Sequence, residues 1–236
     1  MVFLPRTTHL RATQIVGESK MATPGQLVEA MALSLGIPVA TVIQFDRQLA
    51  ENGLRSKSGR GTSAAAVTAR DAANLLIAVA ASPLAGPTVK EAVRTCEAYG
   101  TLKTVQRASW VDNFPMFGLP TLASLPAAHS LREALSVLID GVGKGETFQL
   151  PGWEGVRVRA KDSAFSVQFV GPEPWAEIFA DDPVGEGTSP MARIVYRTWG
   201  IRKRGKRGWG GPDLIQTRRI SFATIRALGS LISRAG

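Results

Sequence analysis

The feature that most constrains this chain is a short turn at Gly36 between two amphipathic segments. Apolar residues repeat at spacings of three and four over residues 24–34 and again over residues 38–51, which predicts one helix in each segment. Gly36 supplies the left-handed backbone conformation at which helices commonly end. Because so few residues join the two helices, we expect them to cross steeply, in the geometry of a helix-turn-helix.

Capping residues mark where helices begin. Thr23 and Gln26 have the spacing of a capping box at the start of the first helix. Thr68 and Asp71 form a second pair of this type, and they precede a helix rich in Ala and Leu over residues 69–81. That helix carries little charge, so we expect it to be buried or packed against another subunit.

The second helix of the pair leaves a polar face opposite its apolar stripe. Side chains on that face have donors that can reach base edges or phosphates. These candidate residues are Thr41, Gln44, Arg47 and Gln48. The alternative is that they form only the solvated face of an amphipathic helix.

A basic, glycine-containing stretch, LRSKSGRGTS, follows the second helix. Glycines let a backbone turn tightly and approach a sugar-phosphate chain, while cations neutralise phosphates or enter a minor groove. The cations of this predicted hairpin are Arg55, Lys57 and Arg60. A basic hairpin directly after a helix-turn-helix is typical of a wing that contacts DNA.

The succession QLVEAMALSLGIPVATVIQFDRQLAENGLRSKSGRG resembles winged helix-turn-helix transcription regulators of the type carried by prophages. The resemblance covers about residues 22–80 and implies a DNA-binding domain whose second helix enters the major groove. It implies base reading by Thr41, Gln44 and Arg47, and backbone contacts by Arg55, Lys57 and Arg60. A first helix is not obvious upstream of Thr23, which leaves residues 69–81 or part of residues 7–18 to complete the core. Winged helices also serve as protein-binding modules.

Positive charge gathers toward both ends of a chain whose formal net charge is +9. Residues 1–70 carry 8 Lys and Arg against 4 acidic residues, residues 71–187 carry 9 against 14, and residues 188–236 carry 11 against 1. This distribution indicates two contact surfaces for an anionic partner, joined by a scaffold.

The second basic segment is GIRKRGKRGWGG, which we expect at the tip of a long hairpin. Its cations are Arg202, Lys203, Arg204, Lys206 and Arg207. Contacts with phosphates are largely blind to sequence, so this segment would add affinity and salt dependence more than specificity. The alternative is a solvated loop whose charge aids solubility.

The fold class predicted from these patterns is α+β: an N-terminal winged helix-turn-helix, a helical middle and a small C-terminal antiparallel sheet with flanking helices. Alternating residues predict a hairpin between residues 156–160 and 165–169, two further strands over residues 191–199 and 213–221, and a closing helix over residues 222–233. The expected organisation is a flexible arm (1–20), a DNA-binding domain with additional helices (21–100), a linker (101–128) and an α+β domain with the basic hairpin loop (129–236).

Residues that would carry chemistry are few. Cys96 with His9 and His129 gives no metal-ligand spacing, so we expect no metal, no cofactor and no catalytic residues. The stretch DGVGKGET around Lys144 lacks the Ser or Thr of a phosphate-binding loop. The acidic run that includes Glu177 is predicted to be a solvated linker. A single cysteine and the lack of a long apolar run predict a cytoplasmic, nucleoid-associated protein with no membrane contact.

We therefore expect a sequence-specific, double-stranded DNA-binding protein that regulates transcription as a homodimer or higher homo-oligomer and is not an enzyme. Two alternatives remain. One is a DNA-binding assembly component, such as a phage packaging-recognition subunit or a plasmid replication initiator. The other is a winged-helix protein-interaction module that binds no DNA.

Overall fold

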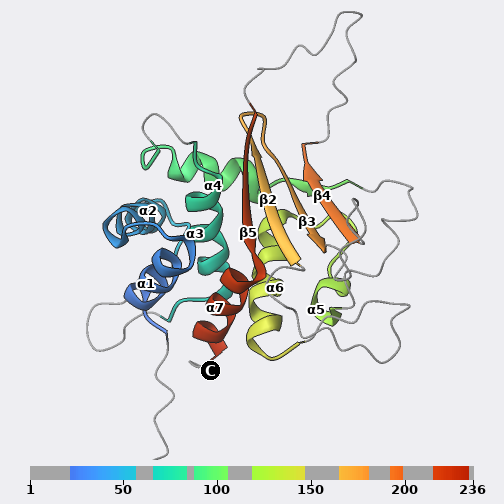
Figure 1. The fold of residues 1–236 in the computed structure, drawn as a ribbon, viewed down its shortest axis with the longest axis horizontal. Helices are drawn as coiled ribbons and strands as arrows, with labels where there is room; N and C mark the ends of the chain where they lie inside the picture. The colour runs from blue at the N-terminus through green and yellow to red at the C-terminus, as the bar shows by residue number, and fades with distance from the viewer. Residues whose placement is uncertain are drawn as a thin grey trace, which may run out of the picture.

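The computed structural model describes residues 22–56, 66–83, 88–105, 119–146, 165–180, 192–198 and 215–233. Within these ranges the chain forms seven α-helices and one five-stranded antiparallel sheet (Figure 1). The predicted α+β class is therefore confirmed. The predicted arm at residues 1–20 lies outside the described residues.

The helices follow the local signals of the sequence. They are α1 (Pro24–Leu35), α2 (Val39–Glu51), α3 (Ala69–Ala81), α4 (Ala92–Gly100), α5 (Pro120–Ala123), α6 (Leu131–Gly143) and α7 (Phe222–Ser233). Complete capping boxes begin α1 at Thr23 and α3 at Thr68, as predicted. A third capping box begins α6 at Ser130. Each box satisfies amide groups that the first turn of a helix leaves without a partner.

The sheet has the strand order β1-β4-β3-β2-β5. Its strands are β1 (Lys103–Thr104), β2 (Phe165–Gly171), β3 (Trp175–Ala180), β4 (Ala192–Arg197) and β5 (Gln216–Ser221). The predicted pairing of residues 156–160 with residues 165–169 is wrong, because β3 pairs with residues 165–170 on one side of β2 and β5 pairs with residues 166–171 on the other. The basic segment also closes no hairpin, because β3 and β2 separate β4 from β5.

Strand β3 was not expected from the sequence. Its Glu177 is buried, and a carboxylate oxygen lies 3.3 Å from Nε of Arg193 on the neighbouring strand β4. Gln168 on β2 donates a hydrogen bond of 3.2 Å to the same carboxylate. Burial raises the pKa of Glu177, and the nearby arginine charges oppose that rise. The prediction that Glu177 lies in a solvated linker is therefore wrong.

Helix α3 lies in the middle of the molecule, between the pair α1–α2 and the sheet (Figure 1). Ten consecutive residues of α3, from Asp71 to Ala80, are buried. It packs against α2, α4, α6, α7 and strands β2 and β5. Ten consecutive buried residues cover the whole circumference of a helix, so α3 needs packing partners on every side. The expectation that α3 is buried is confirmed.

The C-terminal helix α7 packs against both α1 and α6 (Figure 1). The crossing with α6 is very close: a Cβ atom added to Gly143 would lie 2.4 Å from the carbonyl oxygen of Gly229. Only glycine allows the two backbones to approach in this way. Buried side chains from Ala22 to Leu228 form one continuous core. The division into two domains at residues 101–128 stays a prediction.

Candidate nucleic-acid interface

Helices α1 and α2 are joined by a short turn that the sequence determines locally. Gly36 ends α1 with φ 65°, and the amide of Ile37 donates a 3.0 Å hydrogen bond back to Ala32. Pro38 then precedes α2, whose first turn receives no side-chain cap from that residue. The carbonyl of Pro38 accepts a 2.9 Å hydrogen bond from the amide of Thr41 in this first turn.

The exposed face of α2 lies opposite its buried stripe. Val42, Phe45, Asp46 and Leu49 are buried. Of the predicted base-reading residues, Gln44 and Arg47 are exposed, and Thr41 and Gln48 are half-buried at one flank of the face. Arg47 Nε lies 2.8 Å from a carboxylate oxygen of Glu51. Both side chains are largely exposed, so this pair contributes little stability and a phosphate or base could replace it at small cost.

Two apolar residues on α2 were not among the expected site residues. Val39 is 44% exposed and Ile43 is 51% exposed, and they lie one helical turn apart. The apolar stripe that packs into the core runs through Val42, Phe45 and Leu49 and leaves both of them out. That mismatch with the stripe is the sequence signal that could have identified them.

Both ends of the segment over residues 57–65 are fastened to one carboxylate at the start of α3. Asp71 accepts hydrogen bonds of 2.8 Å from the amide of Ser56 and of 2.8 Å from the amide of Thr68. The amide of Val67 also donates a 3.0 Å hydrogen bond to Ala22, the residue before the cap of α1. The chain thus leaves and rejoins the fold at neighbouring points.

Further contacts hold this loop base against α2 and α3. The side-chain amide of Asn74 on α3 donates a 2.6 Å hydrogen bond to the carbonyl of Leu54. The amide of Leu54 donates a 2.9 Å hydrogen bond to Leu49 on α2. The predicted wing residues Lys57 and Arg60 belong to the segment that emerges from this base, and they lie outside the described residues.

Arg55 is placed in an ion pair within the loop base. Its Nε lies 2.7 Å from Oδ1 of Asp46, and the two side chains are 13% and 12% exposed. The contact is an ion pair between two largely buried side chains. Burial raises the pKa of Asp46, and the Arg55 charge opposes that rise. Arg55 therefore positions α2 against the loop base, and the structure does not bring it together with Gln44 and Arg47.

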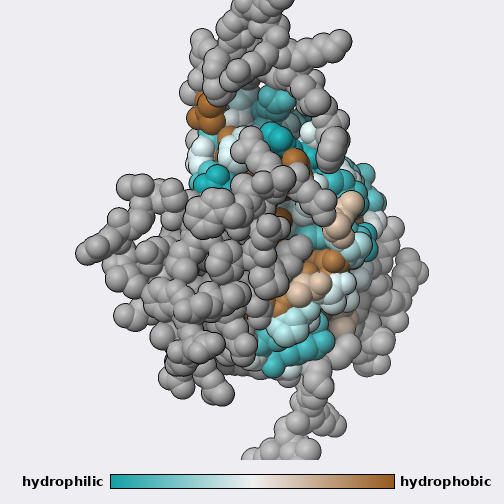
Figure 2. Space-filling model, turned by 90° about the vertical axis from the view of Figure 1, so that its right-hand side faces the viewer, coloured by the Kyte–Doolittle hydropathy of each residue, from teal (hydrophilic) through white to brown (hydrophobic). Residues whose placement is uncertain are grey.

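The second predicted contact is the basic segment between β4 and β5. Its residues Arg202, Lys203, Arg204, Lys206 and Arg207 lie outside the described residues. In Figure 1, β4 lies on the opposite side of the molecule from α2. Figure 2 views that side and shows hydrophilic and hydrophobic residues interspersed over its described surface. The visible described surface therefore includes no broad apolar area of the kind that marks a large docking face.

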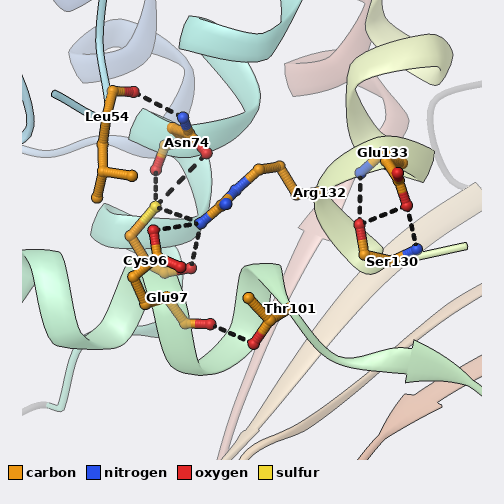
Figure 3. Close-up of polar contacts among 8 residues, drawn as sticks. All are labelled: Leu54, Asn74, Cys96, Glu97, Thr101, Ser130, Arg132 and Glu133. Atoms are coloured by element: carbon orange, nitrogen blue, oxygen red, sulfur yellow. Dashed lines mark hydrogen bonds and ion pairs between the residues drawn. The ribbon is translucent and has the colours of Figure 1, made fainter.

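The one cysteine lies in a polar network that links α3, α4 and α6 (Figure 3). Arg132 on α6 donates a hydrogen bond of 3.2 Å to the carbonyl of Cys96 and one of 3.0 Å to the carboxylate of Glu97. Burial raises the pKa of the Cys96 thiol to about 11. A thiol that stays protonated at neutral pH is a poor nucleophile, so this network serves to join helices.

Other chemical features of the described residues are sparse. They contain no group of three or more His, Cys, Asp or Glu side chains that could hold a metal ion. Lys144 follows the last residue of α6, with Nζ 2.6 Å from Asp140, whereas a phosphate-binding loop precedes a helix. None of the helices in the described ranges is long and apolar enough to cross a membrane.

Comparisons with protein-family models, with curated proteins and with solved structures found no match to this chain.

Proposed function

We propose that this chain is a sequence-specific, double-stranded DNA-binding protein of the winged helix-turn-helix type that regulates transcription. In this proposal α2 enters the major groove and residues 57–65 form the wing. The observation that carries the proposal is the closed loop base: Asp71 holds Ser56 and Thr68 together directly beside the end of α2. A wing requires its two ends to be adjacent and its attachment to be rigid with respect to the recognition helix.

The chemistry of the α2 surface also supports DNA as the partner. Gln44 and Arg47 are exposed together, and each side chain has donors that match base edges in the major groove. The N-terminal end of α2 suits a phosphate, because a helix N-terminus carries partial positive charge. The adjoining segment adds Lys57 and Arg60, so positive charge adjoins a face with base-reading groups.

The packing of the pair α1–α2 supports residues 69–81 as part of the core of the proposed domain. Helix α3 packs against α2, and the C-terminal helix α7 packs against α1. In this proposal the two helices complete the core in place of the helix that is not obvious upstream of Thr23. The DNA-binding part then depends on the C-terminal end of the chain for its stability.

The proposal assigns different tasks to the two basic regions. Gln44 and Arg47 discriminate between sequences, with Thr41 and Gln48 at their flank. The wing residues Lys57 and Arg60 and the segment with Arg202, Lys203, Arg204, Lys206 and Arg207 contact phosphates. The protein acts as a homodimer or higher homo-oligomer in the cytoplasm, associated with the nucleoid, and performs no catalysis. Two copies would double the contact with DNA.

Binding to random duplex and to duplexes selected from a random pool, measured between about 50 and 200 mM salt, tests the proposal. We expect tight, site-selective binding whose affinity falls steeply with salt, and a complex with the mass of a dimer by light scattering. A large multimer on repeated sites would point instead to an assembly component. Failure to bind any duplex at the low-salt end would contradict the proposal and indicate a protein-interaction module.

A further inference from the structure

We infer that Val39 and Ile43 recognise the 5-methyl groups of thymines in the major groove, so that the preferred DNA site carries T·A pairs opposite the N-terminal half of α2. This inference rests on the proposed function. It adds apolar recognition to the polar recognition by Gln44 and Arg47.

The arrangement of the two side chains carries the inference. A single exposed apolar residue is ordinary, as Leu33 on α1 shows with 86% exposure. Val39 and Ile43 differ because they lie one turn apart on one helix, next to the exposed residues Gln44 and Arg47. Two apolar side chains beside two polar ones make a mixed face.

Such a mixed face matches the chemistry of A·T pairs in the major groove. Thymine is the one base that presents a methyl group there, and adenine in the same pair presents a donor and an acceptor that a glutamine can bind. Ile43 and Gln44 are neighbours in sequence on the exposed side of α2, so a methyl group and an adenine edge can be contacted together.

The charge around the face favours DNA over a protein partner. Arg47 lies one helical turn after Ile43, and the segment carrying Lys57 and Arg60 follows the loop base beside the end of α2. A face that docks another protein needs a larger contiguous apolar area than these two side chains provide. Duplex DNA combines the phosphate charge and the isolated methyl groups that this surface complements.

Helix and duplex dimensions predict the spacing of the thymines. Four residues of α-helix advance by about 6 Å. Base pairs follow one another at about 3.4 Å along each strand. Val39 and Ile43 can therefore reach methyl groups that are one or two base steps apart.

Replacing thymine by uracil tests the inference, because uracil lacks the methyl group and keeps the base-pairing edge. Preferred duplexes are first selected with the full-length protein, and each thymine is then replaced singly by deoxyuridine. We expect about a fourfold loss of affinity at one or two positions, since a buried methyl contributes about 0.8 kcal/mol and 1.4 kcal/mol is a factor of ten. The variants Ile43→Ala and Val39→Ala should each lose this sensitivity at one of those positions.

Leu33→Ala is the control, because it removes an exposed apolar side chain outside the α2 face. It should keep the uracil sensitivity of the wild type. If the protein selects sites but uracil changes no affinity, or if both α2 variants keep full sensitivity, the inference is wrong and the proposed function stands. If the wild type selects no site at all, both fail. Circular dichroism of each variant checks that it is folded.

Discussion

Helices α2 and α3 have the same length, 13 residues, but opposite surroundings. Helix α3 is buried over ten consecutive residues, whereas α2 buries one stripe and exposes a mixed polar and apolar face. The two helices meet at the loop base, where Asp71 of α3 holds the segment that follows α2. Helix α3 therefore stabilises the fold, whereas the outer face of α2 is exposed and can contact a partner.

The largest expected effect comes from a cavity in α3. Leu75 is completely buried, so Leu75→Ala should lower the free energy of unfolding by about 2 to 5 kcal/mol. Urea denaturation measures this change. The matched control Leu33→Ala removes an exposed leucine of α1 and should change stability by less than about 0.5 kcal/mol. Equal losses in the two variants would mean that α3 is not the centre of the core.

Asp71→Asn should have the next largest effect, because it weakens the loop base without changing side-chain size. An asparagine has one acceptor oxygen, so it can serve only one of the amides of Ser56 and Thr68. We expect a loss of about 1 to 3 kcal/mol in unfolding free energy and weaker DNA binding. Asp140→Asn, at an exposed ion pair on α6, is the control and should leave DNA binding unchanged.

Acid should destabilise the sheet region through His129. This side chain is buried with Nε2 3.0 Å from the Tyr196 hydroxyl, and burial lowers its pKa. Below pH 6.5 the unfolded chain binds a proton that the folded chain does not. The free energy of unfolding therefore decreases as the pH is lowered, until the pH reaches the lowered pKa of His129 in the folded chain. The slope should be at most about 1.4 kcal/mol per pH unit. Thermal unfolding between pH 5 and 8 measures this pH dependence of stability, and its slope should differ between the wild type and His129→Gln. Equal slopes would mean that His129 is not the group responsible.

Arg47→Ala should have the smallest effect on stability, within about 0.5 kcal/mol, because its ion pair with Glu51 is exposed. On specificity its effect should be much larger, since a lost base contact costs about 1 to 3 kcal/mol of discrimination. Arg94→Ala is matched to it, because Arg94 is also exposed and paired to a carboxylate, Glu91, on its own helical segment. Thermal unfolding should not distinguish the two variants.

The helices could be predicted because their signals are local. Thr23 and Thr68 each form a capping box with the residue three positions later, which predicts the start of a helix, and Gly36 predicts the end of α1. The sheet could not be predicted in the same way, since strand order depends on partners far apart in the chain. Glu177 looked solvated because its partner Arg193 lies in another strand.

The candidate site shows the same limit. The exposed positions of Gln44 and Arg47 followed from the apolar stripe of α2. The ion pair of Arg55 with Asp46 was not predicted from the sequence. Asp46 could have indicated it, because this acidic residue falls on the buried stripe of α2 and a buried carboxylate needs a partner. Lys57 and Arg60 stay predictions, as do the cations of residues 202–207.

We propose that the outer face of α2 reads DNA sequence, and the ratio of the affinities for a selected duplex and for random duplex tests this base reading. We predict that Gln44→Ala combined with Arg47→Ala lowers this ratio by at least tenfold at unchanged stability, while Arg94→Ala leaves the ratio at its wild-type value. A ratio that stays at the wild-type value in the double variant, or that falls equally in Arg94→Ala, would contradict base reading by α2.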